Sequence, residues 1–597
     1  MAFNTVEMRK EFFAEERDES LKEIGQPTRR QDILGHVTGR SPFFDDHRFD
    51  GLLHLRCVRS PHHHARIRRV DTAAAERMPG VVRILHPGDV PHNLNTLLSL
   101  IGFGRDDEPL LAPDTVRYAG EPVCAVIAES ERAAREAAAA VRVDWEVLAH
   151  VLDPEEALAP GAPVVNPVWP RNVFEYHDRY THQKLRFGDV EAAFARRDVT
   201  LVEGRYQMSP IEQAPTETCG AIAAPETNDR FVCYTSTQAL FFSLGTTAKL
   251  LSLPSSRLHF VGGTVGGGFG GKVDSLHEPL AVLGAMLTGR PVKYAWDRAE
   301  EMQVGAPRGA ERWYLKDAVT RDGRIVARRF RGYFDCGAYT RLSSYAVQKA
   351  TAHLPGPYTI PNVSADTYCV FTNRTPATAM RGFGITGVDF AIECHMDKVA
   401  EAAGLDPVEL RILNAYRDGD MKAHRRVAKN TALIECCQVA AEKAGWPVRP
   451  EFAAASSLRD GGGARAEIPT TRTDEDGRID GAPATRPAAA PAAAAPSRPA
   501  APAPAPTPAR DVYGLPVREG PAAPAPRPQA PPVPAAQPAA PPPSPPPSPA
   551  ASPAASPPPA PPAPAAGEPY KPAEPFTRGV KRPGGHRFSS LSGTRRR

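Results

Sequence analysis

The sequence predicts an α+β fold with two folded units and a tail that has no core. Strand-like and helical segments are mixed without a regular βαβ alternation. Five prolines between residues 149 and 171 indicate a linker, and Ala, Pro and Ser dominate the end of the chain. We therefore expect a polar extension at 1–30, folded units at 31–148 and 172–447, and a disordered Pro/Ala-rich tail at 448–597.

The first unit combines short strands with one helix. GLLHLRCVRS (51–60) alternates apolar and polar residues as a half-buried strand does, and PVCAVIA (122–128) is a short apolar run. ERAAREAAAAVRV (131–143) is rich in alanine and predicts a helix, which the short strand VDWEVL follows. These segments predict a small domain of mixed helix and strand.

The second unit begins with the predicted strands TLVEGRYQM and FVCYTST. A helix is expected near 239–252, followed by the strand RLHFVGG, which enters a glycine-rich loop. DSLHEPLAVLGAMLTG (274–289) has helical periodicity, PVKYAW predicts a strand, and further strands are expected to about residue 370. Helices near 387–403 and 432–446 close the unit.

Charge and composition narrow the possible functions. A formal charge of +4 on 597 residues gives no reason to expect binding to nucleic acid or to an anionic membrane. The first 25 residues are charged throughout and contain no apolar core of a signal peptide, so we expect a cytoplasmic protein. The nine cysteines include no CxxC pair, so the sequence predicts no zinc site and no iron–sulfur cluster in this chain.

The segment VGGTVGGGFGGK (261–272) admits three interpretations. Gly266-x-x-x-x-Gly271-Lys272 resembles a phosphate-binding loop, but Val273 stands where a Mg²⁺-binding Ser or Thr is required. Gly266-x-Gly268-x-x-Gly271 also fits a dinucleotide fingerprint, although no βαβ repeat follows. In the third, consecutive glycines allow backbone N–H groups to approach an anionic or oxo-bearing ligand, with Phe269 as an apolar wall.

The third interpretation leads to a family. The segment resembles the glycine loop of molybdenum hydroxylase large subunits, the xanthine dehydrogenase/aldehyde oxidase family. Other motifs agree in the same order along residues 31–447: Thr38-Gly39-Arg40, RSPHHHARI, Ser236-Thr237-Gln238, RPVKYAWDRAEE, Asp335-x-Gly337-Ala338-Tyr339, Ala379-Met380-Arg381-Gly382-Phe383-Gly384 and GLDPVELRILN. The resemblance implies an α/β hammerhead domain followed by a molybdopterin-binding α+β domain.

The resemblance also implies a reaction and its partners. Such subunits bind molybdopterin, either as Mo-molybdopterin or as molybdopterin cytosine dinucleotide, and oxidise an aldehyde or an N-heterocycle with oxygen taken from water. Electrons leave through [2Fe–2S] clusters and FAD. Because this chain lacks the cysteine motifs, the resemblance implies a separate [2Fe–2S] small subunit and an FAD-binding medium subunit.

Individual roles follow from the matching motifs. Gln238 resembles the amide that donates a hydrogen bond to an oxo group, and Phe269 and Arg381 resemble residues beside the reacting centre. Phe383 and, by a looser alignment, Lys349 resemble substrate contacts. The full set implied for the cofactor is Gln238, Gly268, Phe269, Gly270, Ala379, Met380 and Arg381, with no metal ligand from protein side chains. Each role has a structural alternative: a helix cap for Gln238, an ion pair for Arg381 and core packing for Phe383.

Two departures bear on activity. Val273 replaces a glutamate found in purine-oxidising members, and the general-base glutamate of the family has no counterpart after Trp446. The Pro/Ala-rich tail is then either a true disordered segment or the product of a frameshift in GC-rich DNA. We expect the chain as written to be impaired in catalysis; the alternative is a non-catalytic fragment or scaffold that binds an iron–sulfur partner subunit.

Overall fold

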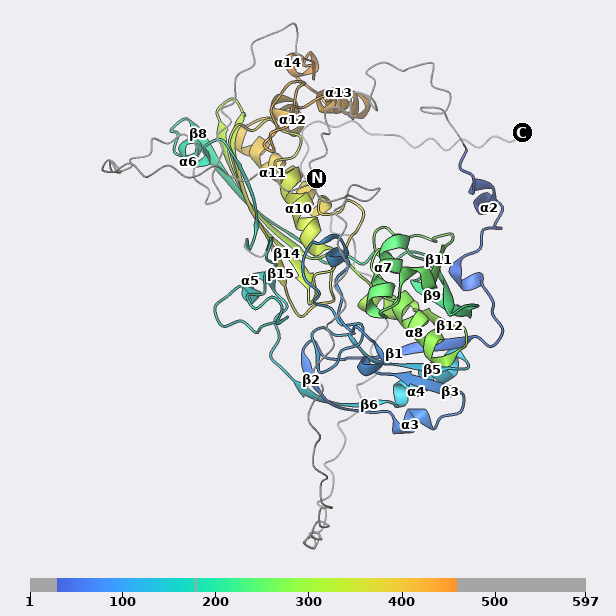
Figure 1. The fold of residues 1–597 in the computed structure, drawn as a ribbon. Helices are drawn as coiled ribbons and strands as arrows, with labels where there is room; N and C mark the ends of the chain where they lie inside the picture. The colour runs from blue at the N-terminus through green and yellow to red at the C-terminus, as the bar shows by residue number, and fades with distance from the viewer. Residues whose placement is uncertain (1–28, 178–179, 459–597) are drawn as a thin grey trace, which may run out of the picture. The chain divides into compact units, whose positions relative to one another are not determined.

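The computed structural model describes residues 29–177 and 180–458 (Figure 1). Their strands form three sheets. The seven-stranded sheet has the order β11 (Leu258–Gly262), β10 (Arg230–Thr235), β9 (Gly220–Glu226), β12 (Val292–Ala295), β1 (Leu53–Arg59), β5 (Pro122–Ala128) and β3 (Val81–Leu85). The five-stranded sheet has the order β7 (Gln183–Phe187), β15 (Val363–Phe371), β14 (Ile325–Gly337), β13 (Glu311–Thr320) and β8 (Val199–Met208). The third contains β4 (Thr115–Val116), β2 (Ala65–Asp71) and β6 (Arg142–Val147).

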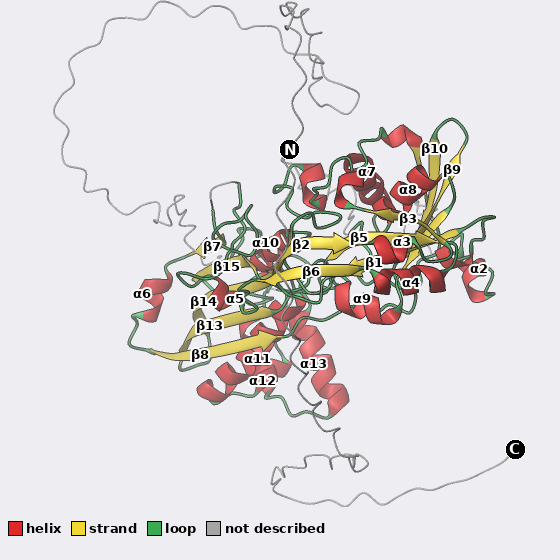
Figure 2. Ribbon diagram, turned by 90° about the horizontal axis from the view of Figure 1, so that it is seen from below, coloured by secondary structure: helices red, strands yellow, loops and turns green. Residues whose placement is uncertain are grey.

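The described chain also contains helices, several of which pack on these sheets. They are α2 (Ile33–Val37), α3 (Ala73–Glu76), α4 (Glu131–Ala140), α5 (Pro154–Ala157), α6 (Val190–Phe194), α7 (Leu240–Leu250), α8 (Glu278–Thr288), α9 (Arg298–Val304), α10 (Ser343–His353), α11 (Thr386–Ala403), α12 (Pro407–Asn414), α13 (Leu433–Ala444) and α14 (Pro450–Ala453). Helix α11 packs along β13 and β8 of the five-stranded sheet (Figure 2). Among the described residues, no helix is long and apolar enough to cross a membrane.

Strand β5 shows why the apolar run at 122–128 is continuous. Ala125 and Ile127 belong to the main core, where a Cβ on Gly284 of α8 would lie 3.0 Å from the Cδ1 of Ile127. Cys124 and Val126 belong to a second core with Ala137 of α4. Because successive side chains of a strand point to opposite faces, both faces of β5 are buried and neither needs polar residues.

The seven-stranded sheet joins the two predicted units. β1 pairs in parallel with β12, so that Leu53 lies opposite Val292, and pairs antiparallel with β5 on its other side. The predicted division into units at 31–148 and 172–447 therefore separates segments that share one sheet.

The mixed content of helix and strand confirms the predicted α+β class, with three differences in detail. Residues 343–353 form α10 within a region where only strands were predicted. The buried face of this helix carries Ser343, Ser344 and Thr351 beside small apolar residues, so the sequence shows only a weak apolar period. The helix predicted from residue 274 begins at Glu278, and the predicted linker at 149–171 contains the short helix α5.

The end of the folded region extends slightly beyond the predicted unit. Helix α14 packs on α12, and the hydroxyl of Ser457 donates a hydrogen bond to Glu435 at 2.6 Å. The predicted disordered tail otherwise lies outside the described residues, as does nearly all of the predicted extension at 1–30.

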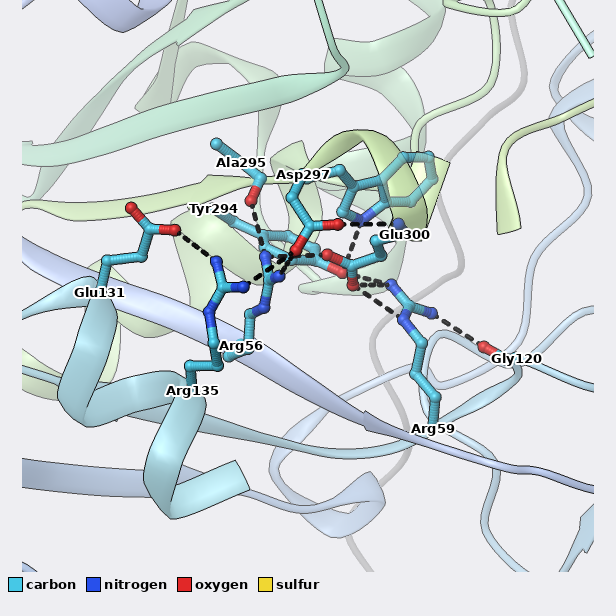
Figure 3. A network of polar contacts seen from close by, with 10 residues as sticks. Arg56, Arg59, Gly120, Glu131, Arg135, Tyr294, Ala295, Asp297 and Glu300 are labelled. Atoms are coloured by element: carbon cyan, nitrogen blue, oxygen red, sulfur yellow. Dashed lines mark hydrogen bonds and ion pairs between the residues drawn. The ribbon is translucent and has the colours of Figure 1, made fainter. Parts of the chain in front are cut away.

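A charged network holds α9 and β12 against the first unit (Figure 3). The carboxylate of Glu300 contacts the guanidinium of Arg56 at 2.9 Å and that of Arg59 at 2.7 Å. Arg59 also donates to the hydroxyl of Tyr294 at 2.7 Å, and Asp297 pairs with Arg56 and Arg135. The Glu300 side chain is only 9% exposed, so its carboxylate is largely removed from water. The two arginines partly compensate the charge that water no longer solvates.

Other carboxylates are buried without a full ionic partner. Asp107 accepts hydrogen bonds from the hydroxyls of Thr96 and Thr340 and from the indole N–H of Trp169, which tie three separate segments together. Burial raises the pKa of Asp107 to about 6 and the pKa of both Glu121 and Glu311 to about 7. These groups bind protons more tightly in the folded chain than in the unfolded chain.

Stability is therefore expected to decrease as the pH rises from about 4 to about 7, between the ordinary pKa values of these groups and their raised values in the folded chain. A carboxyl group with a raised pKa in the folded state stabilises the fold at low pH, and that contribution is lost as the pH rises through the folded pKa, at up to about 1.4 kcal/mol per pH unit for each group. Urea unfolding at several pH values measures the slope. Glu311→Gln is expected to flatten it, and an unchanged slope in this variant would contradict the assignment.

Removal of the central charge of the network is expected to loosen the contact between the units. Glu300→Gln leaves Arg56 and Arg59 without their shared carboxylate, with an expected cost of about 3 kcal/mol because both arginines remain largely buried. Glu203→Gln is the matched control: its pair with Lys316 is exposed, so a loss below about 0.5 kcal/mol is expected. Equal losses of unfolding free energy in the two variants would refute the role of the network.

Candidate functional site

The candidate site lies where three segments of the second unit meet. The glycine loop, residues 263–272, follows β11, and Gln238 lies in the connection between β10 and α7. The third segment, residues 377–384, leads into α11. The structure thus brings together all of the residues predicted for the cofactor, although they are spread over more than a hundred positions of the sequence.

Gln238 is oriented by backbone contacts. Its side-chain Oε1 accepts hydrogen bonds from the N–H of Gly270 at 2.9 Å and of Lys272 at 3.3 Å. Its own N–H donates to the carbonyl of Lys272 at 2.8 Å. The side chain is exposed, and within the described chain its Nε2 has no hydrogen-bond partner. Gln238 therefore offers an uncommitted neutral donor at the surface of the loop.

The glycines of the loop are required by this close approach. A Cβ on Gly268 would lie 2.4 Å from Oε1 of Gln238, so any larger residue would displace the amide. Gly270 has φ of +103°, and a Cβ there would lie 2.6 Å from the carbonyl oxygen of Ala379. These two positions are open only because glycine has no side chain.

The segment at 377–384 is bound to the glycine loop through its backbone. The N–H of Arg381 donates to the carbonyl of Phe269 at 2.7 Å, and the carbonyl of Arg381 accepts from Arg308. The Arg381 side chain is exposed, and its guanidinium has no ion pair among residues 29–177 and 180–458. The structural alternative for Arg381, an ion pair within the fold, is thus not observed, and the charge remains available.

Gln213 contributes to this arrangement and was missed in the sequence. Its Nε2 donates to the carbonyls of Ala306 at 2.8 Å and Ala379 at 2.7 Å. A Cβ on Gly271 would lie 2.9 Å from the Gln213 side chain. A single glutamine after a strand has no local sequence signal, so only the tertiary structure identifies this contact.

An aromatic surface borders the site. The rings of Phe383 and Tyr345 lie 6.1 Å apart, and the ammonium of Lys349 lies 4.8 Å from the centre of the Tyr345 ring. Val273 and Phe242 belong to the same apolar cluster. The two predicted substrate residues, Phe383 and Lys349, therefore contact one tyrosine that the sequence did not single out.

Lys272 is not placed as the lysine of a phosphate-binding loop. Its side chain is 2% exposed, and its Nζ donates to Glu217 at 2.7 Å. Helix α8 begins only at Glu278, so no helix N-terminus directly follows the loop. This geometry disfavours the nucleotide-binding interpretation of the sequence.

The site is an open face. A cavity of about 460 Å³ lies elsewhere, lined by residues that include His63, Met302 and Arg374, and none of the predicted site residues lines it. Phe269 is 46% exposed and Phe241, at the start of α7, is 84% exposed. Within the described part of the chain, no group of His, Cys, Asp and Glu residues is arranged to hold a metal ion.

Comparison with known families decides between the remaining interpretations. Residues 170–415 match the molybdopterin cofactor-binding domain, and residues 38–149 match the a/b hammerhead domain of aldehyde oxidase and xanthine dehydrogenase. The chain is 32% identical over 424 residues to the nicotinate dehydrogenase large molybdopterin subunit of Eubacterium barkeri, which covers 96% of that subunit and 70% of this chain. The chain belongs to the molybdopterin-binding subunits of the xanthine dehydrogenase family.

Other relatives are longer than the matched region. A nicotine 6-hydroxylase large subunit of Paenarthrobacter nicotinovorans is 34% identical over 404 residues, which is 66% of this chain and 48% of that protein. The aldehyde oxidoreductase structure from Desulfovibrio gigas superposes with a TM-score of 0.65 at 30% identity and covers 70% of this chain and 47% of that chain. The chain thus spans about half the length of these two relatives. The family is one of molybdenum-dependent oxidoreductases, as the sequence resemblance implied.

The space reserved by Gly268 leads to a direct prediction. Gly268→Ala is expected to destabilise the chain by about 1 kcal/mol, because the new methyl group must displace the Gln238 amide from the N–H groups of Gly270 and Lys272. Gly88→Ala is the matched control, since a Cβ at that position meets no atom within 4 Å. Urea unfolding of both variants provides the measurement, and equal effects would show that the loop tolerates the methyl group.

Proposed function

We propose that this chain supplies one half of the site of a molybdenum hydroxylase that oxidises an aldehyde or an N-heterocycle. The carrying observation is the Gln238 amide: the glycine loop holds its Oε1, and its Nε2 has no hydrogen-bond partner among the described residues. When bound, the molybdenum cofactor supplies the two-electron oxidation in which an oxygen atom from water is introduced at a carbon of the substrate. The residues present fit such a group, because the exposed side chain of Gln238 offers a neutral hydrogen-bond donor and the exposed side chain of Arg381 offers a positive charge.

The protein residues have separate tasks in this proposal. Gln238 donates a neutral hydrogen bond from Nε2 to an oxygen of the cofactor, since its Oε1 is already occupied by loop amides. The charge of Arg381 attracts the anionic pterin, and Phe269 and Met380 limit access of water from the two loops. Phe383 offers a ring face to a flat substrate beside Tyr345, and the ammonium of Lys349 lies over the Tyr345 ring.

The proposed active enzyme contains more than the matched region. The general-base glutamate implied by the family resemblance is expected in the half of the longer relatives that this region does not cover. We place the [2Fe–2S] clusters and FAD on partner subunits, with a cytosine dinucleotide form of the cofactor as one option. Two relatives, the nicotinate dehydrogenase large molybdopterin subunit and the nicotine 6-hydroxylase large subunit, are named for N-heterocycles, which favours an N-heterocyclic substrate.

The purified 597-residue chain alone is therefore expected to show no substrate-dependent reduction of an electron-accepting dye and to hold less than one molybdenum per chain.

When the chain is purified together with its partner chains, Gln238→Ala is expected to lower the molybdenum and pterin content by about tenfold. The variant loses the neutral hydrogen bond that the Gln238 amide donates to the cofactor, together with the packing of its side chain. Gln207→Ala, at an exposed position on β8, is the matched control.

Two results would overturn the proposal in different ways. Turnover by the pure chain alone would show that the site needs no other half. Absence of pterin from every purified assembly, with the fold intact by circular dichroism, would refute a cofactor-binding role altogether.

A further inference from the structure

Lys272 ends the glycine loop and contacts Gln238 through both of its backbone groups. Its N–H donates to Oε1 of Gln238 at 3.3 Å, and its carbonyl accepts from the N–H of Gln238 at 2.8 Å. The hydroxyl of Thr237 also donates to this carbonyl at 3.2 Å. A displacement of the Lys272 backbone would therefore move the side chain of Gln238.

Glu217 fixes both ends of the same loop. Its Oε2 accepts from Nζ of Lys272 at 2.7 Å and from the N–H of Gly266 at 2.7 Å. The N–H of Glu217 donates in turn to the carbonyl of Gly266 at 3.0 Å. A Cβ on Gly266 would lie 2.5 Å from the Cβ of Glu217, so this contact needs glycine. One carboxylate thus closes the segment from Gly266 to Lys272 into a ring.

The ion pair is almost entirely withdrawn from water. The side chain of Lys272 is 2% exposed and that of Glu217 is 11% exposed. An ion pair in such a place adds little net stability compared with an apolar pair, but loss of one partner leaves an uncompensated charge, so a single arrangement is strongly favoured. Lys272 therefore has almost no surface from which to bind a substrate directly.

We propose that the Glu217–Lys272 ion pair is a positioning element that closes the glycine loop and thereby orients the amide of Gln238. With the loop closed, the N–H groups of Gly270 and Lys272 converge on Oε1 of Gln238, and Nε2 is the group that faces outward. With the loop open, these two donors separate and the amide is free to rotate. The inference rests on the proposed function, in which Nε2 is the group that contacts the cofactor.

The test is hydrogen–deuterium exchange at residue resolution on the full chain without cofactor. Lys272→Met removes the charge and keeps the length of the side chain. Exchange is expected to increase by about tenfold at Gly270 as well as at Gly266, because the ring opens as a unit. Lys272→Arg is expected to restore most of the protection, since it retains the charge and the donors. In the double variant Glu217→Gln/Lys272→Met, the amides of Gly266 and Gly270 are expected to exchange more slowly than in Lys272→Met, because the double variant leaves no unpaired charge.

Lys249→Met is the matched control. Lys249 lies on α7, and its Nζ is 2.5 Å from a carboxylate oxygen of Asp106. Among the described residues, no hydrogen bond or ion pair joins its side chain to the glycine loop. Exchange at Gly270 is expected to be unchanged in this variant. A change confined to Gly266 in Lys272→Met, or an equal increase throughout the chain, would overturn the inference, because the first shows a local contact and the second a general loss of stability.

The cofactor supplies a second, independent readout. In the assembly with partner chains, Lys272→Met is expected to lower pterin content while Lys272→Arg retains it. If the exchange results hold but no variant or wild-type assembly contains pterin, the proposed function fails and the closure of the loop stands. If wild type binds pterin and Lys272→Met binds it equally, the positioning role is refuted and the proposed function stands.

Discussion

The candidate site depends on the close approach of three backbone segments that leave no room for side chains between them. At Gly268 the missing Cβ makes space for the amide of Gln238, and at Gly270 it makes space for the carbonyl of Ala379. Each contact places peptide groups and one amide side chain at fixed positions before any ligand arrives. Such preorganised donors interact with an incoming group without rearrangement, which is the usual physical basis of electrostatic stabilisation in enzymes.

Buried carboxylates join distant segments of the chain at three places in the fold. The Glu217–Lys272 pair lies under the glycine loop, whereas the Glu300 network lies between β1, β12 and α9 (Figure 3). Asp107 satisfies its carboxylate with hydroxyl and indole donors instead of a cation. In all three places, groups from distant parts of the sequence meet at one carboxylate, so each carboxylate specifies which segments lie side by side.

Much of the fold and of the site was predictable from the sequence. Alternating and continuous apolar runs predicted β1 and β5, and the glycine loop together with the motif around Arg381 indicated the site through their family resemblance. Gln213, Glu217 and Tyr345 were not predicted, because each acts through contacts with residues far away in the sequence and has no local pattern. Helix α10 was missed because its buried face contains serine and threonine, which leaves only a weak amphipathic period. The division into two units was drawn at a proline-rich linker, and hydrogen bonding between β1 and β12 cannot be read from composition.

That shared sheet has a consequence for the order of assembly during synthesis. Leu53 donates its N–H to the carbonyl of Pro291, and Arg56 reaches the carbonyl of Ala295, a separation of 239 residues. Until the ribosome has delivered β12, one edge of β1 is without its partner strand. Pairings of such long range form slowly, and an unpaired strand edge is prone to associate with other chains. We therefore expect the nascent N-terminal region to need protection by chaperones until β12 has emerged from the ribosome.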